Sequence, residues 1–439
     1  MDVNRSQEEY TSYSDDSFNN NDEEKSVENF LQRNKKSPKY LALINKKEVK
    51  VPLISTFDTV VSLIILTPCV VGFWRGAMGL MDIYYKYFPA WHSTLLGLSV
   101  HLLFSFTQEH VCDIVKKKSE NKRKKILKMI VSRMYIFVFA LTSIVHWRGA
   151  WLLIDQYLKV EVSATGSVMK KGSETLVYVT VGCFLVLIIL RSLRNCISPP
   201  FVFFIDTKNS IFIIPTRFKT KMSERTSLYV LDCLFSVLVI GTLVVFVWRG
   251  AWALIDIFLF PENDVWSAWG SLIVGYSAVA VAFMLQPFMR WLCDRITGVA
   301  RLLVADIFLI LSLIGTINVW RGIWNLLNIY LLPDQLELSC WLTHWICLIV
   351  LILLGCSNSL LVRGVYIDAE EPAGKCVVFP CYYLRLIFQE QKLKQLHSEQ
   401  TKTEMVTVKP FENNHIVNIQ NANVQYPHTL DVNHKEGEV

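Results

Sequence analysis

Long apolar runs alternate with short polar segments along most of this chain, whereas both ends are polar. Eight of these runs are close to the roughly 20 residues with which a helix crosses the hydrocarbon core of a bilayer. They cover residues 57–75, 91–109, 134–154, 176–194, 228–248, 268–289, 302–320 and 342–362. The second run is the weakest, because serine, threonine and histidine dilute it. The pattern predicts an all-α polytopic membrane protein with eight transmembrane helices.

Composition agrees with this prediction. The 439 residues are 52% hydrophobic and 19% charged, below the roughly 25% charged residues of soluble domains. The acidic start of the chain has no apolar signal-peptide core, so we expect the first span to serve as the targeting signal. Most of the 11 cysteines fall within spans or on the basic side, which favours reduced thiols over a disulfide framework.

Basic residues predict the orientation. The connections 108–132, 191–227 and 290–301 together hold 18 Lys and Arg, and the other four connections hold eight. Because short basic loops stay in the cytoplasm, both termini are predicted to be cytoplasmic. The segments predicted to face outward are 76–90, 156–173, 257–265 and 329–340.

A Trp-Arg-Gly motif occurs four times, each time at the end of an odd-numbered apolar run. The copies read FWRGAMGLMD (73–82), HWRGAWLLID (146–155), VWRGAWALID (247–256) and VWRGIWNLLN (319–328). The triplets are Trp74, Arg75 and Gly76; Trp147, Arg148 and Gly149; Trp248, Arg249 and Gly250; and Trp320, Arg321 and Gly322. Seven residues after the arginines stand Asp82, Asp155, Asp256 and, in the fourth unit, Asn328.

The spacing of the motifs indicates an internal duplication. The four tryptophans are 73, 101 and 72 residues apart, so the first unit matches the third and the second matches the fourth. A four-span block therefore occurs twice, as two pairs of WRG hairpin units. An even number of spans gives both blocks one orientation, related by an axis along the membrane normal.

Short β-rich runs follow each block and predict small cytoplasmic β-hairpins. They are FVFFIDTKNSIFIIP (201–215) and GVYIDAEEPAGKCVVFP (364–380), with a looser version before the first span. The predicted domains are a disordered acidic cytoplasmic tail (1–39), a cytoplasmic hairpin (40–56), the first four-span repeat with its hairpin (57–215), a basic linker (216–227), the second repeat with its hairpin (228–380), and an interfacial segment with a disordered cytoplasmic tail (381–439).

Two interpretations of the motif stay open at this stage. Trp favours the membrane interface and Arg reaches it on a long stem, so the triplet fits an interfacial anchor. Alternatively, the arginine and the acidic residue seven positions later share one helix face, about 10.5 Å apart. That distance is too long for a pair within one helix and favours a ring of ion pairs between units, which Asn328 would leave one carboxylate short.

Other candidate residues are few. His101 and His146 lack partners at metal-ligand spacing and are predicted to be hydrogen-bonded interior residues. Asp58, Asp232 and Asp306 are predicted to cap helix N-termini. Two cysteines flank an aromatic interfacial stretch and are either palmitoylated or unmodified, namely Cys376 and Cys381. No catalytic, metal, cofactor or nucleic-acid motif is found, so we expect no enzyme, no cofactor and no partner among nucleic acids.

The four WRG units, eight predicted spans and cytoplasmic termini resemble the fuseless family of invertebrate membrane proteins over about residues 40–388. The clearest carriers are WRGAWLLID and WRGAWALID; Met78 and Asn328 depart from the pattern. The resemblance implies a neuronal, presynaptic plasma-membrane protein that clusters voltage-gated calcium channels at active zones and supports neurotransmission. It implies that the chain interacts with the lipid bilayer, and that calcium channels or active-zone proteins bind its cytoplasmic hairpins and tails. The alternative is a channel or transporter for a small solute or anion.

Overall fold

The computed structural model describes residues 58–116, 122–161, 174–206, 212–362, 364–370 and 376–379. All of them belong to the first of two units, residues 1–386, and the second unit covers 387–439. The predicted tails and the predicted hairpin at 40–56 lie outside the described residues. Within the described ranges the secondary structure is helical and contains no strands.

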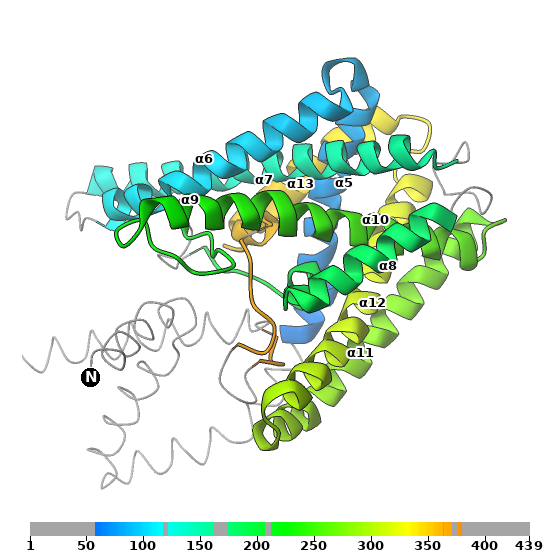
Figure 1. Ribbon diagram of the computed structural model, residues 1–439. Coiled ribbons are helices and arrows are strands. Elements are labelled where there is room, and N and C mark those ends of the chain that lie inside the picture. Colours follow the sequence, from blue (N-terminus) through cyan, green and yellow to red (C-terminus); the bar gives the residue numbers. More distant parts are fainter. Residues whose placement is uncertain are drawn as a thin grey trace, which may run out of the picture. The chain divides into compact units, whose positions relative to one another are not determined.

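Eight helical segments coincide with the eight predicted runs (Figure 1). They are η1 (Ser62–Leu66) continuing into α5 (Thr67–Ile83), α6 (Ala90–Lys116), α7 (Lys122–Leu158), α8 (Glu174–Ile189), the continuous α9 (Thr226–Leu234), η5 (Phe235–Gly241) and α10 (Thr242–Phe258), α11 (Asp264–Arg295), α12 (Gly298–Tyr330) and α13 (Leu336–Leu353). Short 3-10 turns are η2 (Tyr85–Tyr87), η3 (Leu193–Cys196) and η6 (Ser357–Leu360).

Six of these segments are long and apolar enough to cross a membrane. The exceptions among the described helices are α6, which polar residues dilute, and α8, which has 16 residues. Sixteen helical residues reach about 24 Å, short of the roughly 30 Å hydrocarbon core. The chain therefore has the helices expected of a multi-pass membrane protein. That all eight segments cross the membrane stays a prediction.

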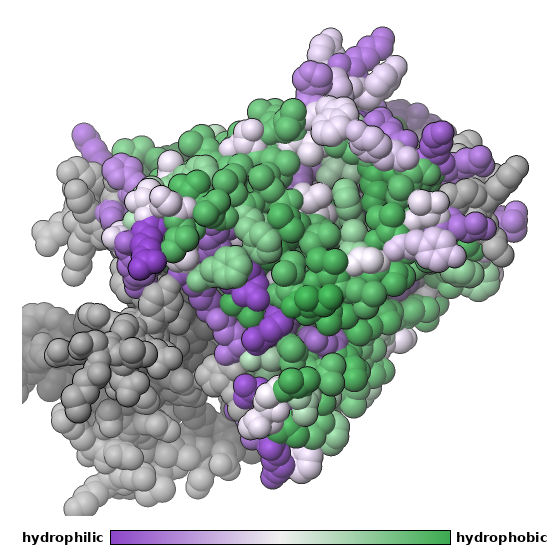
Figure 2. All heavy atoms as spheres, viewed as in Figure 1, coloured by the Kyte–Doolittle hydropathy of each residue, from purple (hydrophilic) through white to green (hydrophobic). Residues whose placement is uncertain are grey.

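The outer surface of the bundle is largely apolar. Large hydrophobic side chains are exposed along α8 and α11, for example Ile189, Ile273 and Met284. In Figure 2 hydrophobic residues cover much of the visible helical face. Apolar surface of this extent is unusual on a soluble monomer and fits contact with lipid.

Each helix that lacks a WRG motif packs mainly on the WRG helix that follows it in the chain. The pairs are α6 with α7, α8 with α10, and α11 with α12, while α13 returns to pack on α5 (Figure 1). This differs from the predicted hairpin units, in which each WRG helix would pack on its successor. Because the last helix packs on the first, the four WRG helices form a closed circle. The hydrophobic pattern of the sequence does not predict which helices pair; the tertiary contacts determine it.

The glycine of each motif lies where the neighbouring helix crosses. A Cβ atom at Gly76 would lie 2.6 Å from a backbone oxygen on α13, and one at Gly322 would lie 2.7 Å from a backbone nitrogen on α11. These distances are too short for any side chain, so glycine permits the close approach of the helices. The residues met are Cys340 for Gly76, Thr94 for Gly149, Thr180 for Gly250 and Leu272 for Gly322.

The two predicted hairpins are not strand pairs in their described parts. The Asp206 N–H donates to the Gly355 carbonyl at 2.8 Å, and the Asp368 N–H donates to the Arg191 carbonyl at 2.8 Å. Each bond joins one half of the chain to the turn that ends a helix of the other half. Backbone groups used in this way are not available for a local hairpin, which explains the difference from the prediction.

The carboxylates of the same two residues cap the 3-10 turns of the opposite halves. Asp206 accepts from the N–H groups of Ser357 at 2.9 Å and Asn358 at 2.7 Å, at the start of η6. Asp368 accepts from the N–H groups of Leu193 at 2.7 Å and Arg194 at 2.8 Å, at the start of η3. Burial raises the pKa of the Asp368 carboxyl, and its bonds from the N–H groups of Arg194 and Leu193 oppose the shift.

Candidate functional site

The WRG motifs lie inside their helices, and all of their residues are buried except Trp147, which is half-buried. The helices continue for about two turns beyond each triplet, to Ile83, Leu158, Phe258 and Tyr330. The exposed fraction is 4% for Trp74 and 1% for Arg75, and the other three arginines are also below 4%. An interfacial anchor must face headgroups and water. The interpretation of the motif as an interfacial anchor is therefore wrong.

The four motif arginines instead form a closed ring with residues of neighbouring units. Each arginine Nε donates to the side chain that stands seven residues after the arginine of the preceding unit. The pairs are Arg148 with Asp82 at 2.6 Å, Arg249 with Asp155 at 2.6 Å, Arg321 with Asp256 at 2.8 Å, and Arg75 with Asn328 at 2.8 Å. The ion pairs between units that the spacing favoured are thus present, and the units follow one another around the ring in chain order.

The pairs differ in their depth. The Asp82 side chain is 58% exposed and that of Asp155 is 18% exposed, whereas that of Asp256 is 3% exposed. At the deepest pair, Arg321 also donates to the side chains of Ser267 at 2.7 Å and Ser271 at 2.6 Å. Because both side chains of this pair are buried, loss of either one would leave the other as an unpaired buried charge, at a greater cost than in the other two pairs.

The four motif tryptophans form a second ring. Neighbouring indoles stand edge to face, with centroids 5.3–5.8 Å apart and interplanar angles of 76–82°. This is the favoured geometry of aromatic pairs. The ring members in order are Trp74, Trp147, Trp248 and Trp320, and Trp320 contacts Trp74. Side chains from all four WRG helices therefore meet at one centre.

Carbonyl groups from the segments that follow α8 and α13, residues 190–206 and 354–362, bind three of these indoles. We call these two segments the crossing loops. The Nε1 atom donates from Trp74 to Leu360 O at 3.1 Å, from Trp248 to Cys196 O at 3.0 Å and from Trp320 to Pro199 O at 2.8 Å. One turn further along the helices, Trp151, Trp252 and Trp324 pack edge to face at 5.7 and 5.9 Å. Met78 occupies the corresponding position of the first unit, so this second layer has three tryptophans.

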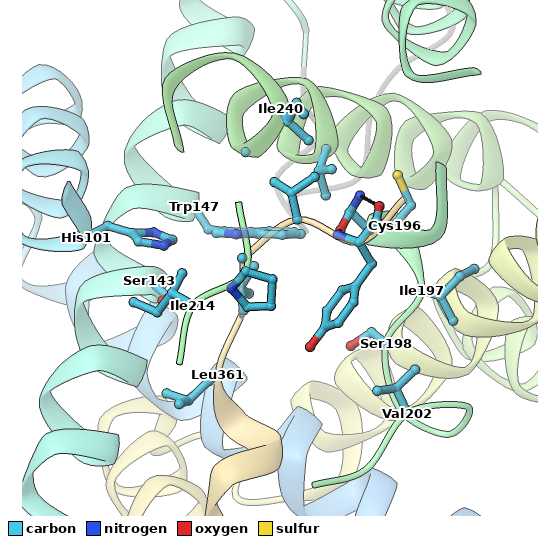
Figure 3. A pocket seen from close by; sticks show the side chains of 18 of the residues that line it. His101, Ser143, Trp147, Cys196, Ile197, Ser198, Val202, Ile214, Ile240 and Leu361 are labelled. Carbon is cyan, nitrogen blue, oxygen red and sulfur yellow. Dashed lines mark hydrogen bonds between the residues drawn. The ribbon is translucent and has the colours of Figure 1, made fainter. Parts of the chain in front are cut away.

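A cavity of about 130 Å³ lies between the tryptophan ring and the crossing loops. In Figure 3, His101 and Trp147 lie on one side of it and Cys196, Ser198 and Val202 on another. Within the part of the chain that the structure describes, three buried polar atoms of the cavity wall have no hydrogen-bond partner, namely His101 Nε2, His146 Nε2 and Ser105 Oγ. The histidines are interior residues as predicted, but these ring atoms are not hydrogen-bonded. In the described ranges no three metal-ligating side chains gather.

Two of the three aspartates predicted as helix caps, Asp232 and Asp306, have other positions. Asp232 lies within α9, whose N-cap residue is Arg225. Its carboxylate accepts from Phe218 N at 3.0 Å and Thr220 N at 3.1 Å, and so ties the predicted basic linker to the bundle. Asp306 lies two turns into α12 and is 4% exposed, and neither carboxylate oxygen has a hydrogen-bond partner in the described ranges. The cap interpretation is wrong for both residues.

Sequence reasoning missed Arg133, which pairs with Asp206 and also donates to Ser357. Arg133 stands fourteen residues before Trp147, and Asp306 stands fourteen residues before Trp320. Aligning the units on their tryptophans would have revealed this exchange of an arginine for an aspartate. Of the two candidate lipidation sites, Cys376 is buried and Cys381 lies outside the described residues.

Comparisons with known proteins bear on this architecture. No curated protein and no solved structure matches the chain. The family described as Fuseless matches residues 53–361, a range that holds all four WRG motifs, both rings and most of the cavity wall. The match covers well over half of the chain and agrees with the resemblance seen in the motifs. The chain belongs to the Fuseless family.

Proposed function

We propose that this chain is a non-enzymatic, multi-pass protein of the presynaptic plasma membrane that organises voltage-gated calcium channels and so supports neurotransmission. The proposal starts from membership of the Fuseless family. The presynaptic role is what the resemblance of the WRG units to that family implies. The proposed orientation of the chain, with both termini in the cytoplasm, rests on the imbalance of basic residues between the loops.

The tryptophan ring is the observation that favours this organising role over a channel, because it closes the centre of the bundle. Four indoles in contact at 5.3–5.8 Å fill the centre between the WRG helices, where a pore between four like-oriented units would run. Three of them are also tied to loop carbonyls. A closed centre surrounded by ion pairs between the WRG helices suits a rigid framework that presents surfaces to partners.

The test is a replacement experiment in synapse-forming neurons that lack the endogenous protein. We expect the wild-type chain to restore calcium-channel density at active zones and evoked release. A matched variant should carry the membrane core with residues 390–439 removed; it should reach the surface but restore channel density poorly if the tail binds partners. Normal channel density without any form of the chain would contradict the proposed function.

The alternative function is a channel or transporter for a small solute or anion. One observation favours it: the cavity beside the tryptophan ring has a polar wall with unpartnered histidine and serine atoms. Such a cavity could hold a solute on one side of a closed gate. Purified protein in liposomes separates the two functions. The scaffold function predicts no solute uptake or current, whereas uptake that increases in Trp248→Ala would support a gated path.

A further inference from the structure

Arg75 is the member of the arginine ring without an acidic partner. The other three arginines each face an aspartate carboxylate at 2.6–2.8 Å. Arg75 faces the neutral amide of Asn328, whose Oδ1 accepts from Arg75 Nε at 2.8 Å. Among the described residues the ring therefore carries one positive charge in excess.

Water makes almost no direct contact with Arg75. It is 1% exposed, among the largest fully buried side chains that the structure describes. Its Nη1 donates to Ser339 Oγ at 2.9 Å and lies 3.4 Å from Thr343 Oγ1. Its Nη2 has no hydrogen-bond partner among the described residues. A buried guanidinium that lacks a counter-charge and has no hydrogen bond from its Nη2 is strongly unfavourable unless something compensates it.

An open pocket of about 550 Å³ reaches Arg75 from the surface between α5, α12 and α13. Trp324, Asn325 and Asn328 share its wall with Arg75. Because Asn328 Oδ1 accepts from Arg75, the N–H groups of this amide are directed elsewhere and are suited to donate. The pocket thus combines a buried cation with neutral amide donors, which is the chemistry that binds an anion.

The same pocket limits the charge of the anion. Two carboxylates also line it, those of Asp82 and Asp264. Asp82 is paired with Arg148, and Asp264 is an exposed residue at the start of α11. These carboxylates repel a multivalent anion more strongly than a monovalent one. One negative charge also suffices to balance the ring.

We propose that this pocket binds one small monovalent anion, a halide or the carboxylate of a small acid. The anion would balance Arg75 as an aspartate balances the arginine in each of the other three units. The site is independent of the proposed function, since a scaffold would use the anion to stabilise its ring and a transporter could carry it.

The test measures thermal unfolding of the purified full-length chain in detergent. Chloride or acetate replaces methanesulfonate, a bulkier and weakly binding anion, at constant ionic strength. Because a ligand that binds the folded state raises stability with its concentration, we expect a saturable rise in the unfolding midpoint of the wild-type chain. Asn328→Asp supplies the missing carboxylate, so its midpoint should be higher in methanesulfonate and should not respond to chloride or acetate.

Two further variants keep the result interpretable. Asn328→Leu removes the amide but leaves Arg75 unbalanced, so it should still respond to the anion. Gln156→Glu adds the same charge beside another unit and should respond like the wild-type chain. A response to chloride alone or to acetate alone supports the site and identifies its occupant. An absent response in the wild-type chain, or an equal response in Asn328→Asp, would overturn the proposal.

Discussion

Arg321 and Asp256 form the most deeply buried ion pair of the ring, with 2.8 Å between Nε and Oδ1 and side chains 1% and 3% exposed. The pair joins the fourth WRG helix to the third. The same contact recurs between Arg249 and Asp155, nearer the surface. The strength of the ring therefore varies around its circumference, and mutation should reveal this gradient.

Replacing the arginines one at a time should give losses of stability that follow the burial of their partners. Arg321→Gln leaves Asp256 buried and unpaired and should cost about 3–5 kcal/mol. Arg148→Gln leaves Asp82, which is 58% exposed, and should cost less, with Arg249→Gln between them. Unfolding midpoints in detergent and the amount at the cell surface check this order. Arg321→Gln should be the most damaging of the three because the partner of Arg321 is Asp256 and not Asn328 of its own unit. Equal losses at the three positions would contradict the gradient.

Exchange of charges should identify the neighbour of each unit. The double variant Arg249→Asp with Asp155→Arg keeps the ion pair and should recover part of the surface expression that either single variant loses. The same exchange between Arg249 and Asp82, or between Arg249 and Asp256, joins residues that are not paired and should give no recovery. Surface labelling of the three double variants and their singles measures this. Recovery with Asp82 or Asp256 would refute the order of units.

The motif glycine of the third unit should tolerate no side chain. A Cβ atom at Gly250 would overlap the side chain of Thr180 on α8, so Gly250→Ala should separate α8 from α10 and lower stability by about 1–3 kcal/mol. Gly182 is a matched control, because it lies in α8 and a Cβ atom there meets nothing within 4 Å. Gly182→Ala should be neutral or slightly stabilising through helix propensity. The unfolding midpoints of both variants check this, and a silent Gly250→Ala would contradict the tight crossing.

Two buried aspartates should respond in opposite ways to the same substitution. Asp306 has no hydrogen-bond partner for either oxygen, so Asp306→Asn removes an unfavourable buried charge and should raise the unfolding midpoint. Asp232 accepts from Phe218 N, Thr220 N and Thr216 Oγ1, so Asp232→Asn should lower stability by about 1–3 kcal/mol. Paired thermal unfolding curves measure both effects. A loss in Asp306→Asn would show that its carboxylate has a bonding role.

Antibody access to inserted tags should establish the orientation. Tags at residues 10 and 430 should be labelled only after cells are permeabilised, because the excess of basic residues in the connections predicts that both ends are cytoplasmic. A tag between residues 156 and 173 should be labelled on intact cells. Labelling of either terminal tag on intact cells would exclude this topology.

The sequence by itself determined the positions of the helices, the recurrence of the WRG motif and the family. Apolar runs and motif spacing are properties of neighbouring positions in the chain, so they can be read without a structure. The seven-residue spacing from Arg249 to Asp256 also showed that these side chains share one helix face and must find partners on other units. The spacing did not show whether each arginine pairs with the acidic residue of the preceding unit or of the following unit.

Only the tertiary structure decided those partners. Packing of α13 on α5 closes the circle, and this places Arg75 against Asn328 instead of a carboxylate. Packing of the WRG helices also buries Trp74, Trp248 and Trp320, which composition alone would place at the membrane interface. Asp206 and Asp368, which belong to the predicted hairpins, cap turns of the opposite half. These features depend on contacts between residues that are far apart in the chain, which local hydrophobic periodicity does not encode.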